Sequence, residues 1–276
     1  MGGLARSPKV ITLAKANHIL PEIARILLSG GVIAVPTDTI YGLACCSLST
    51  RGIDRIYQIK GRDSAKPMAI CLDKAISLPQ WSNTEGIESN LLSSLLPGPV
   101  TILLPRLADD PLNPLLNPCV MEIGIRVPDS SLVCHLSEVL ALVLYSEGVT
   151  SEDLHVRPQC FSATAIPLVL TSANVSGQKS TLSPDEFSDL WPQLDLVVDG
   201  GRIGGDGNGD ELVISRAGST VVDLSPAVRS RGQRLHYRIL RDGSALHQTE
   251  ETLRHFGFIR EPGLQIRSNF TQTSDY

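Results

Sequence analysis

Hydrophobic residues along this chain gather in short continuous runs, and helical patterns lie between the runs. In residues 17–30 apolar side chains recur every three or four positions, which is the spacing of an amphipathic helix. The glycine pair Gly30-Gly31 ends this helix, because glycine takes the left-handed C-cap conformation without steric cost. Val32 to Val35 then forms an unbroken apolar run, typical of a strand covered on both faces.

The same alternation continues to about residue 243. Apolar runs predict strands in MAICL, VTILLP, IGIRVP, PLVL, LDLVVD and STVVDL, and helical spacing favours helices at residues 50–58 and 91–96. Strands that alternate with helices indicate an α/β fold. Several strands break into hydroxyl, amide or charged residues, such as Thr37-Asp38-Thr39 after the first run. Ligands gather where the strands of open α/β sheets end, so these exits are expected to line one shared cleft.

Three segments do not follow this pattern. Residues 141–165 have no clear period and separate a predicted helix from the PLVL strand. Residues 200–218 are rich in glycine and acidic side chains, which predicts a surface loop. After Ala245 the chain is polar, so residues 246–276 are expected to form a frayed tail.

Composition places the chain among ordinary globular proteins. It has 276 residues, of which 42% are hydrophobic and 19% charged, and its formal net charge is −5. That charge argues against general affinity for nucleic acid or anionic membranes, although a local basic cleft is compatible with it. No apolar run approaches the length that spans a membrane, so no membrane partner is expected.

Cysteine usage and the first residues bear on the compartment. None of the six cysteines forms a C-x-x-C pair or a cluster with zinc-ligand spacing, so no metal site is expected and a reducing, cytoplasmic location is favoured. Arg6, Lys9 and Lys15 precede any acidic residue, which leaves a mitochondrial or other organellar location as the alternative.

Common catalytic signatures are missing. The sequence contains no G-x-x-x-x-G-K-[ST], no G-x-S-x-G and no H-E-x-x-H. The IKGRDSAKP stretch instead places three cations, Lys60, Arg62 and Lys66, between a helix and a buried strand. Lysine and arginine there suit phosphate or carboxylate groups, whereas the alternative is a solvated charged surface.

Other strand ends carry small polar groups. TSANVSG offers Thr171, Ser172, Asn174 and Ser176, which could surround phosphates or simply form a turn that caps the next helix. Arg126 in GIRVPDS could reach a carboxylate or lie on the surface. Ser219 and Thr220 add hydroxyls at a further strand, where they could equally serve the strand itself.

In combination these motifs are far more specific. PTDTIYGL, KGR…KP, LLPGPVTILL, GIRVPDS, TSANVSG and GSTVVDL occur in this order and resemble the YrdC-type threonylcarbamoyl-AMP synthase family over roughly residues 14–243. The resemblance implies a single-domain, twisted mixed α/β sheet curved around a deep basic cavity. It places a catalytic domain at residues 14–245, between an N-terminal extension (1–13) and the C-terminal tail, and matches the short form of the family.

The resemblance also implies an activity. Such enzymes make L-threonylcarbamoyladenylate and pyrophosphate from L-threonine, bicarbonate and ATP, with Mg²⁺ expected on the triphosphate. The product goes to a tRNA threonylcarbamoyltransferase complex, which modifies adenosine 37 of tRNA.

Roles follow by matching motifs. Lys60 and Arg62 would face the ATP phosphates and carry catalysis. Further ATP contacts would come from Ser172, Asn174, Ser180 and Arg241. The threonine pocket would be lined by Thr39, Tyr41, Arg126 and Ser219.

Some features depart from the pattern and leave alternatives. Cys71 stands where many relatives carry histidine, and residues 141–165 look like an insertion. The chain could therefore be a variant that this insertion has impaired. A further alternative is a non-catalytic module that binds tRNA or double-stranded RNA through a concave basic surface, with steeply salt-dependent affinity.

Overall fold

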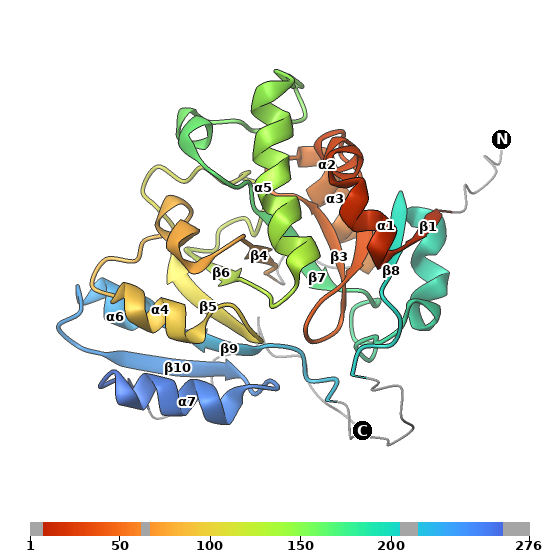
Figure 1. Cartoon of the computed structure of the whole chain (residues 1–276). Helices are drawn as coiled ribbons and strands as arrows, with labels where there is room; N and C mark the ends of the chain where they lie inside the picture. The colour runs from red at the N-terminus through yellow and green to blue at the C-terminus, as the bar shows by residue number, and fades with distance from the viewer. Residues whose placement is uncertain (1–7, 62–66, 205–214, 262–276) are drawn as a thin grey trace.

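The computed structural model describes residues 8–61, 67–204 and 215–261. Its centre is an eleven-stranded mixed sheet with the order β1-β8-β2-β3-β7-β4-β6-β5-β9-β10-β11 (Figure 1). The strands are β1 (Lys9–Thr12), β2 (Ile33–Pro36), β3 (Tyr41–Cys46), β4 (Ala69–Cys71), β5 (Val100–Pro105), β6 (Glu122–Arg126), β7 (Leu168–Ser172), β8 (Leu196–Asp199), β9 (Thr220–Asp223), β10 (His236–Arg241) and β11 (Ile259–Arg260). The sheet contains both parallel and antiparallel pairs, which confirms the predicted mixed α/β fold.

Helices pack on the sheet in two groups. The α-helices are α1 (Leu13–His18), α2 (Leu20–Leu28), α3 (Thr50–Lys60), α4 (Ser89–Leu95), α5 (Ser131–Ser146), α6 (Ser225–Arg229) and α7 (Leu246–His255), and three short 3₁₀ segments are η1 (Ala75–Gln80), η2 (Pro158–Ser162) and η3 (Pro184–Gln193). In Figure 1, α1, α2, α3 and α5 lie together at the upper side, whereas α4 and α7 lie beside β10 at the lower left.

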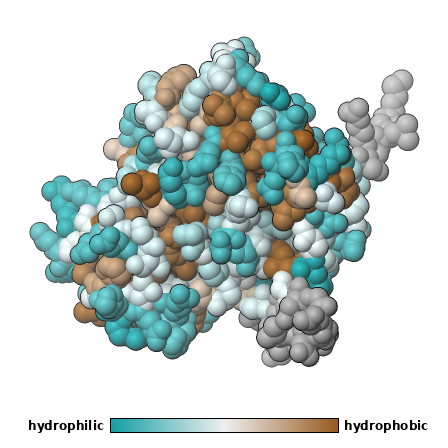
Figure 2. All heavy atoms as spheres, in the orientation of Figure 1, coloured by the Kyte–Doolittle hydropathy of each residue, from teal (hydrophilic) through white to brown (hydrophobic). Residues whose placement is uncertain are grey.

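The central strands are buried on both faces, as continuous apolar runs require. Every residue of β2 and β3 is buried, and β5 is buried except at Pro105. Burial of apolar area contributes about 25 cal/mol per Å², so this two-sided core is the main source of stability. On the face drawn in Figure 2, polar side chains cover the lobe formed by β10 and α7, and hydrophobic residues are scattered among them.

The two ends of the described chain are more ordered than the sequence indicates. Lys9 to Thr12 pairs in parallel with β8, so part of the expected N-terminal extension is sheet. The expectation of a frayed tail directly after Ala245 is wrong for residues 246–261, because α7 and β11 are formed there. Leu253 and Phe258 anchor this segment by burying their side chains.

The irregular stretch at 141–165 is also partly helical. Residues 141–146 complete α5, residues 158–162 form η2, and residues 153–155 contact the chain at the start of α3. Asp153 accepts hydrogen bonds there from the Arg51 amide (2.6 Å) and the Ser49 hydroxyl (2.5 Å), while its carbonyl accepts from the Thr50 amide (2.9 Å). A carboxylate at a helix N-terminus pairs with free amides and the positive end of the helix dipole. The segment therefore stabilises the helix that ends in Lys60.

Candidate functional site

The loop between β2 and β3 (residues 37–40) folds over the sheet and carries the Thr-Asp-Thr motif. The Thr37 hydroxyl donates to the Ile40 carbonyl (2.7 Å) and accepts from the amides of Thr39 and Ile40, each at 3.2 Å. One hydroxyl thus satisfies three backbone groups of a tight turn, which explains why threonine follows Pro36. This turn holds Asp38 against Arg126, with which it forms an ion pair.

Arg126 is the last residue of β6 and lies beside the end of the neighbouring strand β4. Cys71 of β4 is its register partner, and the Leu72 amide donates to the Arg126 carbonyl at 3.0 Å. Burial raises the pKa of the Cys71 thiol to about 12, so this side chain is neutral beside the guanidinium. Cys71 therefore adds no charge beside Arg126.

Ser219, just before β9, and Arg241, at the end of β10, contact each other. Arg241 Nη2 donates to the Ser219 hydroxyl (2.9 Å) and Arg241 Nε to the Ser219 carbonyl (3.0 Å). Thr101 Oγ1 lies 2.8 Å from Ser219 Oγ. Gly243 lets the chain turn back here, because a Cβ on it would lie 2.1 Å from the Thr220 amide nitrogen. The structure thus brings together two residues that the sequence assigns to different substrates, Ser219 to threonine and Arg241 to ATP.

A second cluster forms where α3 ends beside β7. Lys60 is 1% exposed, and its Nζ donates to the Ser172 carbonyl (2.6 Å) and to the Asn174 carbonyl. Nζ also lies within hydrogen-bonding distance of Ser172 Oγ (3.3 Å) and Asn174 Oδ1 (3.2 Å). The predicted grouping of Lys60 with Ser172 and Asn174 is thus present, with the lysine ordering the turn that follows β7.

Tyr41 and the start of β3 link the two clusters. The Tyr41 amide donates to the Thr181 carbonyl and the Tyr41 carbonyl accepts from the Ala173 amide, both at 2.9 Å. The Tyr41 hydroxyl donates to the Gly201 carbonyl (2.7 Å) and accepts from the Gly200 amide (2.9 Å), and burial raises its pKa to about 12. In this conformation the Tyr41 hydroxyl is bonded to the backbone of Gly200 and Gly201. The predicted contact of Tyr41 with threonine stays a prediction.

The remaining predicted residues are placed as follows. Thr39 is buried, with Oγ1 3.2 Å from Thr37 Oγ1. Ser180 is half-buried, and its carbonyl accepts from Arg216 at 2.5 Å. Arg62 lies outside the described residues, as do Lys66 and residues 205–214 of the glycine-rich loop.

Sequence reasoning missed Asp38 and Thr101 as members of the cluster. Asp38 lies inside the PTDT motif, but its partner is 88 positions away, so only the folded loop reveals the pair. Thr101 lies within an apolar strand run, where nothing distinguishes it from a strand threonine.

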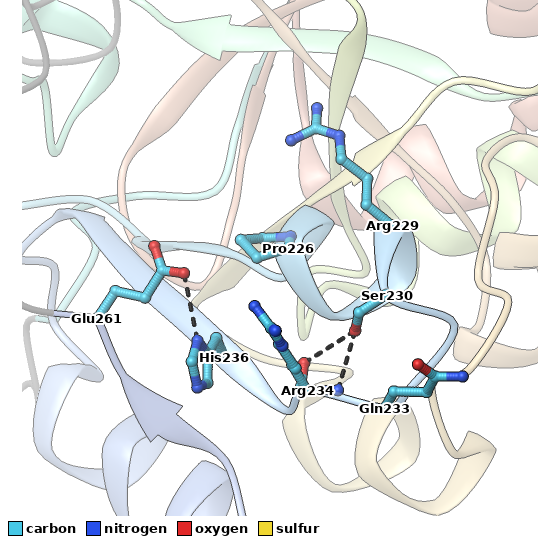
Figure 3. Close-up of a pocket in the computed structure, with 7 residues that line it drawn as sticks. All are labelled: Pro226, Arg229, Ser230, Gln233, Arg234, His236 and Glu261. Atoms are coloured by element: carbon cyan, nitrogen blue, oxygen red, sulfur yellow. Dashed lines mark hydrogen bonds and ion pairs between the residues drawn. The ribbon is translucent and has the colours of Figure 1, made fainter.

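A hollow of about 430 Å³ lies away from these clusters, between α6, β10 and β11 (Figure 3). It begins at His236, the opposite end of β10 from Arg241, so it is separate from the clusters described above. Figure 3 shows the Arg229 side chain pointing away from His236 and Glu261. Arg229 pairs with Glu122, and Glu261 pairs with both His236 (3.4 Å) and Arg238 (2.5 Å). The charges there largely compensate one another.

Metal and membrane features can be stated for the described ranges. Within residues 8–61, 67–204 and 215–261, no group of three or more His, Cys, Asp or Glu side chains could hold a metal ion. In the same ranges, no helix has both the length and the apolar character that crossing a bilayer requires.

Fold and site together define a mixed α/β protein whose strand ends gather cations, hydroxyls and amides suited to anionic substrates. The family model Sua5_yciO_yrdC, described as "Telomere recombination", matches residues 25–243. The chain is 38% identical over 237 residues to the threonylcarbamoyl-AMP synthase of Bos taurus, covering 86% of this chain and 72% of that protein. It is 40% identical over 227 residues to the Homo sapiens threonylcarbamoyl-AMP synthase, covering 82% and 68%. The chain belongs to the Sua5/YciO/YrdC family, which confirms the resemblance seen in its motifs.

Solved structures agree on the fold. Pyrococcus abyssi Sua5 complexed with L-threonine aligns with a TM-score of 0.62 at 23% identity, covering 84% of this chain and 56% of that one. Escherichia coli YciO aligns with a TM-score of 0.60 at 23% identity, covering 82% and 90%. This chain therefore spans a little over half of the Sua5 chain and most of YciO. The depth and charge of the predicted cavity stay a prediction.

Proposed function

We propose that this protein is a threonylcarbamoyl-AMP synthase, which makes L-threonylcarbamoyladenylate and pyrophosphate from L-threonine, bicarbonate and ATP. The observation that carries the proposal is its identity of 38–40% to two mammalian proteins of that name over more than four fifths of this chain. The side chains gathered at the strand ends suit the substrates: arginine for a carboxylate, and lysine, hydroxyl and amide groups for phosphates.

In the proposed reaction, the threonine amine and bicarbonate give a carbamate and water, and a carbamate oxygen then attacks the α-phosphorus of ATP and displaces pyrophosphate. The step needs no covalent enzyme nucleophile, in keeping with the missing nucleophile motifs. Holding the reactants in line can lower a barrier by about 7–11 kcal/mol. Fixed donors and cations at the phosphates would add electrostatic stabilisation.

Each cluster has its own task in this proposal. Arg126 and Ser219 bind the amino acid beside the 37–40 turn, while Ser172, Asn174 and Arg241 contact the nucleotide. Lys60 is bonded to the Ser172 and Asn174 carbonyls, so its first effect is to fix the turn that presents those two side chains. A magnesium ion would rest on phosphate oxygens and water, which Mg²⁺ commonly keeps as ligands.

The segment at 141–165 supports an active rather than an impaired protein. Asp153 caps the helix that carries Lys60, so the segment stabilises the site instead of disturbing it.

The test is release of pyrophosphate by purified protein, measured with each substrate omitted in turn. We expect release only when ATP, threonine and bicarbonate are all present, together with threonylcarbamoyl-AMP detected by mass spectrometry. Folded protein that binds RNA but yields no product would instead favour a non-catalytic RNA-binding module.

A further inference from the structure

The turn after β7 carries Asn174 and Ser180, two residues that the sequence motifs assign to ATP. Its first end is fixed by Lys60, which donates to the Asn174 carbonyl. The Asn174 side-chain amide then donates to the Gln178 carbonyl at 2.6 Å, so Asn174 itself closes the first part of the turn. Ser180 lies beyond this closure, and its carbonyl is bonded at the far end of the turn.

Arg216 makes the contact at that far end. Its Nη1 donates both to the Ser180 carbonyl (2.5 Å) and to Glu186 Oε2 (2.6 Å), and its Nη2 donates to Glu186 Oε1 (3.0 Å). A two-point contact between a guanidinium and a carboxylate fixes the orientation of the arginine as well as its distance. The same guanidinium therefore holds the Ser180 carbonyl in a defined direction.

Glu186 is in turn bonded to the backbone beside the turn. Its Oε2 accepts from the Leu182 amide at 3.1 Å, and its Oε1 also accepts from Arg202 at 3.1 Å. Leu182 is buried, so the carboxylate is anchored to the core of the protein. A continuous series of bonds thus runs from Leu182 through Glu186 and Arg216 to Ser180.

Ser219, only three residues after Arg216, is held by different contacts. Arg241 donates to the carbonyl and to the hydroxyl of Ser219, and Thr101 Oγ1 lies 2.8 Å from that hydroxyl. Removing the Arg216 side chain would therefore release Ser180 and leave Ser219 in place.

We propose that Arg216 is a positioning residue for the nucleotide: bonded to Glu186, it fixes the turn that presents Ser180 to ATP. This inference rests on the proposed function, in which ATP is a substrate, and it adds a residue that lies outside every motif of the sequence. A turn that is ordered before the ligand arrives lowers the entropic cost of binding. The effect is therefore on the affinity for ATP, with little effect on threonine.

The experiment measures the KM values for ATP and threonine by pyrophosphate release, and the affinity for a non-hydrolysable ATP analogue by calorimetry. Arg216→Met keeps an unbranched side chain but removes its donors. We expect the KM for ATP to rise at least tenfold and the analogue to bind at least tenfold more weakly. The KM for threonine should change less than threefold.

Arg202→Met is the matched control. Arg202 donates to Glu186 as Arg216 does, but within the described residues it has no hydrogen bond to Ser180. We expect this variant to keep the KM for ATP within twofold of the wild-type value.

Glu186→Gln is a second variant, which removes one of the two acceptors that orient Arg216. We expect it to raise the KM for ATP about threefold. Thermal unfolding verifies the folding of each variant, and Glu186→Gln decides the question if Arg216→Met does not fold.

Two results would overturn the inference. Arg216→Met and Arg202→Met could weaken ATP binding equally, which would mean that the loss follows from lower stability alone. Alternatively, folded Arg216→Met could bind the analogue as tightly as the wild-type protein does. A wild-type protein that binds the analogue but releases no pyrophosphate would refute the proposed function, and the calorimetric comparison would still decide the role of Arg216.

Discussion

Two basic regions of this molecule differ in how their cations are used. Lys60 is buried at the end of α3, where it donates to backbone carbonyls of the turn after β7, and Arg126 is buried at the end of β6, where it pairs with Asp38. Around the hollow at α6 and β10 the charged side chains are at least partly exposed, and Arg229 and Arg238 pair with Glu122 and Glu261. Burying a cation is expensive, so the first region must be maintained by function or by turn geometry, whereas exposed pairs contribute little.

The largest effect is expected from Lys60→Met, which keeps the length of the side chain but removes its charge. The Ser172 and Asn174 carbonyls would lose their donor, and hydrogen bonds to a charged group contribute about 1.5–3 kcal/mol each. We expect activity to fall more than 100-fold and the midpoint of thermal unfolding to drop. Unchanged turnover and melting would mean that the buried lysine is dispensable.

Arg126→Gln comes next, because it leaves Asp38 as an unpaired buried carboxylate. Removing one partner of a buried ion pair destabilises the fold by about 3–5 kcal/mol, and the same substitution removes the proposed contact with the threonine carboxylate. Steady-state kinetics should show a KM for threonine raised at least 30-fold, with the KM for ATP changed less than threefold. An equal rise in both KM values would contradict a role confined to the amino acid.

Glu186→Gln tests a half-exposed network between the two extremes. Arg216 and Arg202 pair with Glu186, and the hydrogen bond from Arg216 is the main cause that lowers the Glu186 pKa to about 2. A lowered folded-state pKa stabilises the protein above the unfolded-state pKa of about 4.3, and this contribution disappears as pH falls toward 2. We expect a loss of about 1 kcal/mol at pH 7, reduced by solvent screening, that shrinks between pH 5 and pH 3 in urea unfolding. A loss independent of pH would assign the effect to packing.

The smallest effect is expected from Arg234→Ala in the exposed hollow. Among the described residues, only backbone atoms of Arg234 take part in hydrogen bonds. Surface substitutions of this kind change stability by less than about 0.5 kcal/mol, and activity should change less than twofold. A large loss of pyrophosphate release would mean that the exposed hollow takes part in the reaction. The two basic regions would then not differ in function.

The sequence predicts the core strands well where burial alone decides them. The run VTILLP matches β5 (Val100–Pro105) residue for residue. A strand covered on both faces is a continuous apolar run, so its ends coincide with the ends of the run. Tyr41–Cys46 was missed as a strand, since it follows a polar turn and contains glycine and alanine, which disfavour strands. The edge elements after Ala245 were missed because they are polar and depend on two buried anchors.

The site is predictable only in part for a related reason. Lys60, Ser172 and Asn174 are recognisable from motifs and do meet in the fold. The Asp38–Arg126 pair could not be predicted, because it depends on a turn that folds across the sheet. The Ser219–Arg241 contact likewise depends on the return of the chain at Gly243.

The most direct test of the account is pyrophosphate release by the purified full chain with ATP, L-threonine and bicarbonate. The account predicts release that stops when either threonine or bicarbonate is omitted, with one threonylcarbamoyl-AMP formed per pyrophosphate. Release that continues without threonine, or none from folded protein with all three substrates, would contradict it.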